Sequence, residues 1–296
     1  MFPSQGTAAK KTKYIVTMKT HIDLKDLVKS KYSEIALQDK ASNAASCCGA
    51  GSCSTEVYNI MTDDYEGLQG YNPDADLALG CGLPTQFAGI KAGDTVLDLG
   101  SGAGNDCFVA RHETGETGKV IGVDFTPAMI EKARKNAANL GYTNVEFIEG
   151  DIEELPVAND TVDVVVSNCV LNLVPDKEKA FAEMFRVIKP GGHFSVSDVV
   201  LKGELPVALK SAAEMYAGCV SGAIQKDKYL NHIFMAGFQK LSIQKEKEIV
   251  LPDDILSDYL TPSEIETYRQ SGNGIYSVTV YAEKAGECCA PGCGCK

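Results

Sequence analysis

The sequence predicts an α/β protein with a doubly wound parallel sheet and a smaller α+β unit towards the C-terminus. Strand-like apolar runs alternate with helical patterns over residues 95–199, which is typical of a parallel sheet with helices on both faces. Residues 162–166 are almost continuously apolar, as a central strand buried on both faces should be. After residue 199 this alternation ends, and the remaining helices and strands predict the smaller unit.

The N-terminal part, residues 1–71, is expected to hold one helix and a cysteine-containing loop. Apolar residues recur at helical spacing from Asp23 to about Leu37, which predicts the helix. Residues 41–55 are rich in Gly, Ser and Ala and predict the loop. The cysteines of this loop are Cys47, Cys48 and Cys53.

The central domain, residues 72–200, is expected to carry the sheet. A helix over residues 127–141 has Pro in its first turn and Gly at its end, where each residue type is preferred. Residues 190–192, Pro-Gly-Gly, predict a turn into the last strand. The expected strands are residues 95–99, 119–124, 145–149, 162–167 and 193–198.

The C-terminal region, residues 201–284, is expected to form the smaller unit, and residues 285–296 a flexible tail. The tail is too short and too rich in glycine to fold alone. Its cysteines are Cys288, Cys289, Cys293 and Cys295. The expected elements of the smaller unit are helices near residues 207–218 and 226–236, and strands near residues 241–250 and 275–282.

Charge and composition exclude several classes of function. The net charge of −12 argues against a nucleic-acid substrate, which needs a basic surface. No apolar run reaches the roughly 18 residues of a membrane span, and the N-terminus lacks the apolar core of a signal peptide. We therefore expect a cytoplasmic protein without nucleic-acid or membrane partners. Its 11 cysteines should be mostly thiols, used for metal or metalloid binding, for redox chemistry or simply buried.

A glycine-rich turn, Gly100, Gly102 and Gly104, joins a strand to a helical pattern that begins at Asp106. Glycines allow a sharp turn and let a ligand lie against the backbone, near the N–H groups that open a helix. The spacing is G-x-G-x-G and not the G-x-G-x-x-G of dinucleotide-binding proteins, so no pyrophosphate is expected. The turn predicts a site for a nucleotide-like ligand.

This turn, preceded by Asp98, resembles motif I of the class I S-adenosylmethionine-dependent methyltransferases. The resemblance implies S-adenosylmethionine as methyl donor, with Asp98 near its amino acid end and Asp124 accepting hydrogen bonds from the ribose hydroxyls. A carboxylate suits that role because it is acceptor-only and takes two donors at once. Another nucleotide on a Rossmann-like core is the alternative.

The resemblance also implies an adenine contact at Asp151 and Ile152, with a loop-capping aspartate as the alternative. Asn168 either orients the acceptor loop or contacts the cofactor, and the sequence leaves both open. The expected cofactor-binding residues are Asp98, Gly100, Gly102, Gly104, Asp124, Phe125, Met129, Asp151, Ile152 and Asn168.

Three cysteines have settings that point to chemistry. Cys169 directly follows the fourth strand, at the sheet edge where open α/β folds bind ligands. Cys81 lies between two glycines before the fold, and Cys219 lies in the glycine-flanked segment Gly218–Gly222 after it. These contexts, in this order on a class I core, resemble the arsenite methyltransferases. The Cys47-Cys48 loop and the cysteine-rich tail resemble the microbial members, and the resemblance covers residues 23–296.

The chain departs from many algal and animal members at one place. They carry an aromatic pair just before the glycine-flanked cysteine, where this chain has Ala78 and Leu79. Tyr65 and Tyr71 are the candidates to cover the cofactor sulfonium instead.

The implied reaction is transfer of the methyl group of S-adenosylmethionine to trivalent arsenic bound by Cys81, Cys169 and Cys219. Soft arsenic selects thiolates, and its lone pair attacks the methyl group without a general base. The protein supplies orientation and excludes water. Cys47 or Cys48 is a candidate fourth thiol. The resemblance implies that a cysteine of the N-terminal region, with Cys47, Cys48 and Cys53 all open, pairs with Cys81 and is reset by a reductant such as thioredoxin or glutathione. Residues 201–284 are expected to cover the arsenic, and the enzyme to be a monomer.

Other interpretations remain at this stage. One is a quinone- or isoprenoid-type small-molecule methyltransferase of the same fold, and another is a thiol-based metalloid-binding protein. Cys169 alone could be a core residue, which is how we interpret Cys107. The tail is either dispensable or delivers arsenic. The histidines are not expected to bind metal, since they show no ligand spacing: His21, His112, His193 and His232.

Overall fold

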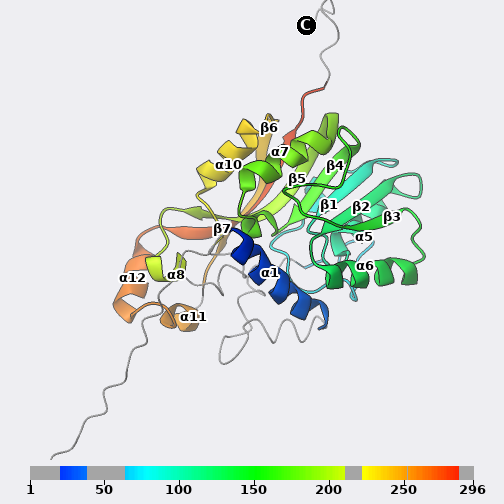
Figure 1. Cartoon of the computed structure of the whole chain (residues 1–296). Coiled ribbons are helices and arrows are strands. Elements are labelled where there is room, and N and C mark those ends of the chain that lie inside the picture. Colours follow the sequence, from blue (N-terminus) through cyan, green and yellow to red (C-terminus); the bar gives the residue numbers. More distant parts are fainter. Residues whose placement is uncertain (1–20, 39–63, 211–221, 252, 287–296) are drawn as a thin grey trace, which may run out of the picture.

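The computed structural model describes residues 21–38, 64–210, 222–251 and 253–286, and seven strands form one sheet (Figure 1). The strand order is β3-β2-β1-β4-β5-β7-β6. Strands β1 to β5 are parallel to one another, whereas β7 is antiparallel to both β5 and β6. The strands are β1 Thr95–Leu99, β2 Lys119–Asp124, β3 Val145–Glu149, β4 Val162–Asn168, β5 Ile188–Lys202, β6 Gln239–Ile249 and β7 Gly274–Glu283. The expected doubly wound α/β fold is confirmed.

Helices cover both faces of the sheet (Figure 1). The described helices are α1 His21–Ala36, α4 Pro84–Phe87, α5 Asn105–Thr114, α6 Pro127–Asn139, α7 Lys177–Val187, α8 Val207–Lys210, α10 Lys226–Met235, α11 Asp253–Ser257 and α12 Pro262–Gln270, with a 3₁₀ turn η1 at Leu171–Leu173. None of the helices in these ranges is long and apolar enough to cross a membrane.

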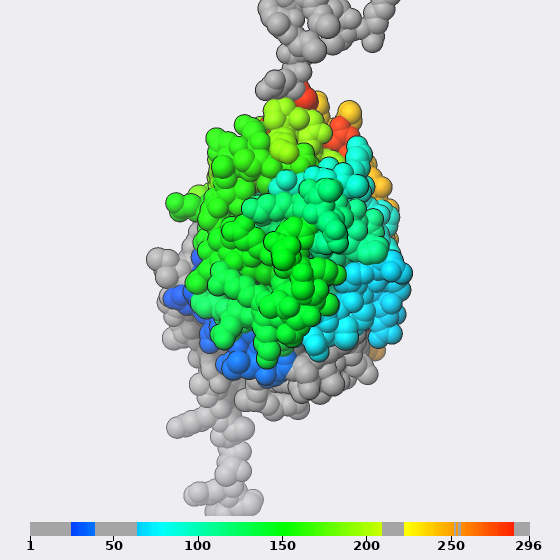
Figure 2. Space-filling model, turned by 90° about the vertical axis from the view of Figure 1, so that its right-hand side faces the viewer, coloured from blue at the N-terminus to red at the C-terminus, as the bar shows by residue number. Residues whose placement is uncertain are grey.

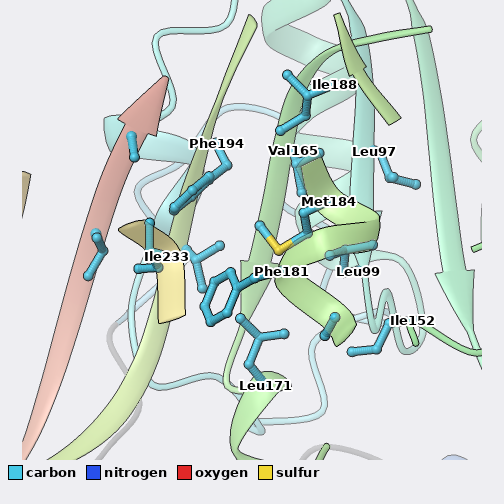
Figure 3. Close-up of a cluster of buried hydrophobic side chains, with 14 of the residues drawn as sticks. Leu97, Leu99, Ile152, Val165, Leu171, Phe181, Met184, Ile188, Phe194 and Ile233 are labelled. Atoms are coloured by element: carbon cyan, nitrogen blue, oxygen red, sulfur yellow. The ribbon is translucent and has the colours of Figure 1, made fainter. Parts of the chain in front are cut away.

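Alternation of side chains along the strands separates two cores. Leu97 and Leu99 of β1 belong to a core with Phe181 of α7 and Ile233 of α10. Val96, the residue before Leu97, points to the opposite face of the sheet and belongs to the core formed with α5 and α6. Figure 3 shows the helix residues Phe181 and Ile233 in this core together with strand residues such as Phe194. The sheet is therefore buried on both faces, as its apolar strands predict.

The C-terminal strands extend the central sheet at its β5 edge. β7 pairs with β5 over ten consecutive residue pairs, from His193↔Glu283 to Lys202↔Gly274. A third core lies where β5 and β7 run on past the parallel strands, and it contains Leu201, Leu260 and Ile275. Cys81 and Cys169 belong to this core as well. Helices α8, α11 and α12 lie on this side of the molecule, away from β1, β2 and β3 (Figure 1).

Two details differ from the sequence-based expectations, and a third can be followed only in part. Residues 190–192 lie inside β5 as an irregular stretch with Gly191 at φ 83°, and not in a separate turn. Helices α11 and α12 were not expected. Thr261 and Glu264 form a capping box, which is a sequence signal for the start of α12. The helix expected over 207–218 begins as α8, and its remainder from residue 211 lies outside the described residues.

Phe181→Ala is expected to lower the free energy of unfolding by about 3–5 kcal/mol, because it empties a fully buried position. The matched control is Phe234→Ala on α10, where the ring is 69% exposed, with an expected change within about 0.5 kcal/mol. Urea unfolding followed by circular dichroism measures both. Equal losses in the two variants would contradict the assignment of the core.

Candidate active site

A cavity opens at the carboxyl ends of the parallel strands, where the strand order reverses between β1 and β4. It encloses about 1100 Å³ of empty space, including its open mouth. Eight of the ten expected cofactor-binding residues line it: Asp98, Gly100, Gly102, Asp124, Phe125, Asp151, Ile152 and Asn168. Gly104 and Met129 do not line it.

The glycine turn adopts the conformation that its sequence predicts. Gly100, Gly102 and Gly104 all have positive φ, a region that residues with side chains rarely adopt. A Cβ on Gly102 would meet nothing within 4 Å, so its backbone faces the cavity. A Cβ on Gly104 would lie 2.8 Å from the rings of Phe108 and Phe147. Gly104 therefore serves close packing beneath the cavity. Met129 is likewise buried in the core below.

Two buried carboxylates face the cavity from the ends of β1 and β2. Asp124 accepts the N–H groups of Gly102 and Thr126 at 3.0 and 2.8 Å. Asp98 accepts the thiol of Cys107 at 3.2 Å. Burial raises the pKa of Asp98 well above its usual range, and the nearby Asp106 carboxylate raises it further. Cys107 is fully buried, as expected, and its thiol also has a polar partner.

Helix α1 closes the cavity from the side. Lys25 of α1 donates to Asp151 at 2.6 Å and to Glu153 at 2.5 Å. Asp151 also accepts the N–H of Glu153 at 2.9 Å, so it caps its loop in addition to lining the cavity. Figure 2 shows the blue surface of α1 against the green surface of the central domain. Helix α1 also contacts α6. The cover of the cavity thus comes from the N-terminal helix.

The thiols of Cys81 and Cys169 converge beside this cavity. Their Sγ atoms and a carboxylate oxygen of Asp198 all lie within 4.8 Å of one another, and all three residues are buried. Cys169 itself lines the cavity. The third expected ligand, Cys219, lies outside the described residues, as do Cys47 and Cys48.

Cys169 has an unusual backbone. Its φ of 61° lies in the left-handed region, which costs free energy for a residue with a side chain. Its N–H donates to the carbonyl of Ser197 at 2.8 Å, so the neighbouring strand β5 holds it in place. The surrounding structure therefore fixes the direction of this thiol.

Asn168 connects the thiols to the cavity. Its Oδ1 accepts the N–H of Cys81 at 3.0 Å, and its Nδ2 donates to the carbonyl of Gly82 at 2.8 Å. The same Nδ2 donates to Asp106 at 3.2 Å and contacts the hydroxyl of Tyr65. Asn168 thus orients the Cys81 loop, and it also lines the cavity.

The glycines on either side of Cys81 permit this contact. A Cβ on Gly80 would lie 2.7 Å from Nδ2 of Asn168, and one on Gly82 would lie 2.5 Å from Oγ of Ser197. Any larger residue at either place would push the loop away from the sheet. Close packing of this loop against the sheet therefore requires glycine on both sides of Cys81.

Of the two tyrosines that the sequence analysis proposed as a cover for the cofactor, only one lines the cavity, and an acid at the cavity was missed. Tyr65 lines the cavity and donates to Asp106 at 2.9 Å, whereas Tyr71 donates to Asp76 and does not line it. Asp106 lines the cavity too, and its Oδ1 is buried without a hydrogen-bond partner among the described residues. The signal for Asp106 was an acid in the first turn of a helix that follows the glycine turn.

Asp198 was missed as well. It is completely buried, and it accepts the N–H of Val199 at 3.0 Å and the hydroxyl of Tyr229 at 3.3 Å. Burial raises the pKa of Asp198 to about 7, against the attraction of Lys177. Its signal was its place at the end of an expected strand, the same place that made Asp124 a candidate.

Comparison with known proteins agrees with this geometry. A family model described as a methyltransferase domain matches residues 90–237. An arsenite methyltransferase of Halobacterium salinarum is 38% identical over 275 residues, which cover 88% of this chain and 67% of the relative. This chain belongs to the arsenite methyltransferase family. An X-ray structure of an arsenic(III) S-adenosylmethionine methyltransferase from Chlamydomonas reinhardtii shares this fold, with 36% identity and a TM-score of 0.60 over 70% of this chain and 68% of that chain.

The similarity to arsenite methyltransferases extends beyond the methyltransferase core. A ubiquinone/menaquinone biosynthesis C-methyltransferase of Klebsiella pneumoniae is 39% identical, but over 110 residues that cover only 37% of this chain. The quinone-type alternative therefore shares only the core of the fold.

Gly82→Ala is expected to lower the rate of arsenic methylation by about 100-fold, because the displaced loop misplaces a reacting group. The control is Gly67→Ala, where a Cβ would meet nothing within 4 Å and the rate should not change. Replacing Ser197 by Gly in the Gly82→Ala protein removes the atoms that clash and should restore part of the rate. An unchanged rate in Gly82→Ala alone would contradict the close packing of the loop.

Asp106→Asn is expected to flatten the pH dependence of stability. Burial raises the pKa of Asp106 from 3.8 to about 6, against hydrogen bonds from Tyr65 and Asn168. The native state therefore binds more protons than the unfolded chain between these values, so the free energy of unfolding falls as the pH rises through them. Urea unfolding of both proteins across this window measures the slope. The same slope in both would show that Asp106 does not titrate differently on folding.

Proposed function

We propose that this chain transfers the methyl group of S-adenosylmethionine to trivalent arsenic held by Cys81, Cys169 and Cys219. Its family membership makes it an S-adenosylmethionine-dependent methyltransferase. The observation that carries the proposal is the meeting of two buried thiols beside the cofactor cavity. Thiolates are the ligands that soft, thiophilic arsenic selects.

The cavity has the polar groups that S-adenosylmethionine requires. Both oxygens of Asp124 keep a second lone pair for ribose hydroxyls. Asp98 and Asp106 present carboxyl groups towards a cationic ligand, and one oxygen of Asp106 has no hydrogen-bond partner among the described residues. Gly102 leaves open space at the turn. When bound there, the cofactor supplies an electrophilic methyl group. The contacts of Asp151 and Ile152 with adenine belong to the same proposal.

The thiols hold the nucleophile in place. Arsenous acid exchanges its three hydroxides for three thiolates, and each thiol gives its proton to a leaving hydroxide, so three waters depart. The arsenic keeps its lone pair for attack on the methyl carbon, and no general base is needed. The fixed backbone of Cys169 and the burial of Cys81 supply orientation and exclude water.

Methylation consumes the arsenic lone pair, so a further round requires two electrons. We assign them to the thiols of Cys81 and of either Cys47 or Cys48, which give up two electrons and two protons as they form a disulfide. Thioredoxin or glutathione then reduces this disulfide. A chain that works through thiols needs a reducing compartment, which supports a cytoplasmic location. Residues 201–284 would cover the arsenic through Cys219, and the enzyme would act as a monomer.

The test is incubation of the full chain with S-adenosylmethionine, a thiol reductant and arsenite, followed by chromatography with arsenic detection. Methylated and dimethylated arsenic are expected only when the cofactor is present. Serine at Cys81, Cys169 or Cys219 should lower the rate by about 100-fold or more, because a misplaced reacting atom already costs that much. Cys107→Ser keeps a donor to Asp98 and is the control, with the rate preserved.

The other outcomes separate the alternatives. Arsenic that binds but stays inorganic would indicate a metalloid-binding protein. Full activity of Cys169→Ser would show that the arsenic site lies elsewhere. Calorimetric titration with S-adenosylmethionine checks that each serine variant retains the cofactor site.

A further inference from the structure

Arsenic binding leaves one buried group of this site without a role. Three thiolates satisfy trivalent arsenic, and the cofactor residues lie on other strands. Yet the carboxylate of Asp198 is within 4.8 Å of both Cys81 and Cys169, and it is completely buried. Burying a carboxylate is costly unless it is paired or binds a cation.

The three groups are held in place independently of Cys219. The backbone of Cys81 is fixed by Asn168 and by a hydrogen bond from Ser277, and that of Cys169 by Ser197. Asp198 lies in the middle of the long pairing between β5 and β7. Two sulfur atoms and one carboxylate oxygen therefore form a cluster to which Cys219 does not contribute.

We propose that Cys81, Cys169 and Asp198 also bind a divalent cation of the zinc and cadmium class, and that this cation blocks arsenic binding. Two thiolates and a carboxylate are a zinc-type ligand set, with a fourth position left for water. The proposal rests on the proposed function only in that arsenic uses the same two thiols. Arsenic needs Cys219 as its third ligand, whereas the cation uses Asp198.

The charges support a divalent ion. Two thiolates and one carboxylate carry three negative charges, of which a divalent ion offsets two. The remaining charge lies near Lys177, which is buried and attracts the Asp198 carboxylate. Lys177 itself is anchored by the carbonyls of Asn172 and Val174, at 3.3 and 3.0 Å. The buried charges are thus close to balanced when the cation is bound.

The consequence is mutual exclusion at one pair of thiols. A bound cation holds Cys81 and Cys169, so arsenite cannot form its three-sulfur complex. Zinc or cadmium should therefore inhibit methylation competitively with arsenite and without competing with S-adenosylmethionine.

Calorimetric titration with Zn²⁺ and Cd²⁺ tests the proposal. To remove other thiol sites, the full chain carries serine at the terminal cysteines, which are Cys47, Cys48, Cys53, Cys288, Cys289, Cys293 and Cys295. One cation per chain is expected. Asp198→Asn should weaken binding by at least about tenfold, since even substitutions behind the ligands cost 10- to 100-fold. The matched control Asp163→Asn, a partly buried aspartate at the opposite end of β4, should bind the cation as before.

Cys219→Ser gives a second, independent readout that leaves Asp198 intact. It should bind the cation with unchanged affinity although it no longer methylates arsenite. Loss of cation binding in Cys219→Ser would make Cys219 the third ligand and overturn the proposal. Unchanged binding in an Asp198→Asn protein that still binds S-adenosylmethionine would overturn it too. Failure of the unsubstituted chain to methylate arsenite would instead reject the proposed function and leave the cation titration interpretable.

Discussion

The side-chain amide of Asn168 is the contact on which the site depends. Asn168 is the last residue of β4, at the point where the strand order reverses. Its amide hydrogen-bonds both to the Cys81 loop and to Asp106. An amide offers both an acceptor and two donors, so one side chain can hold a loop and a cavity wall together. The glycines around Cys81 let the loop come close enough for these bonds. The distance between thiols and cofactor cavity is therefore set by buried polar contacts and not by loop length.

The central sheet could be predicted closely from the sequence because its signals are local. The expected strands at residues 95–99, 119–124 and 145–149 match β1, β2 and β3 to the residue. Continuous apolar runs bounded by glycine and aspartate report a strand wherever it lies in the chain. The positions of Asp98, Asp124 and Cys169 at strand ends follow from the same signal, since the ends of parallel strands meet at one edge of the sheet.

The parts that could not be predicted depend on tertiary contacts. Nothing in the local pattern of α1 says that Lys25 reaches Asp151, because that ion pair joins segments far apart in the chain. The pairing of β7 with β5 is equally non-local, so the sequence revealed the strand but not its place in the sheet. Asp198 looks like any acid at the end of a strand, and only the fold brings it to the thiols.

The left-handed backbone of Cys169 has a consequence for how the enzyme evolves. Glycine and asparagine adopt that conformation at lower cost than cysteine, by about 1–2 kcal/mol for glycine. Substitution by glycine or asparagine at this position is therefore expected to relieve backbone strain while it removes the thiol. If Cys169 binds arsenic as proposed, the stability gained with glycine is opposed by the loss of an arsenic ligand, so stability and activity pull this position towards different residues.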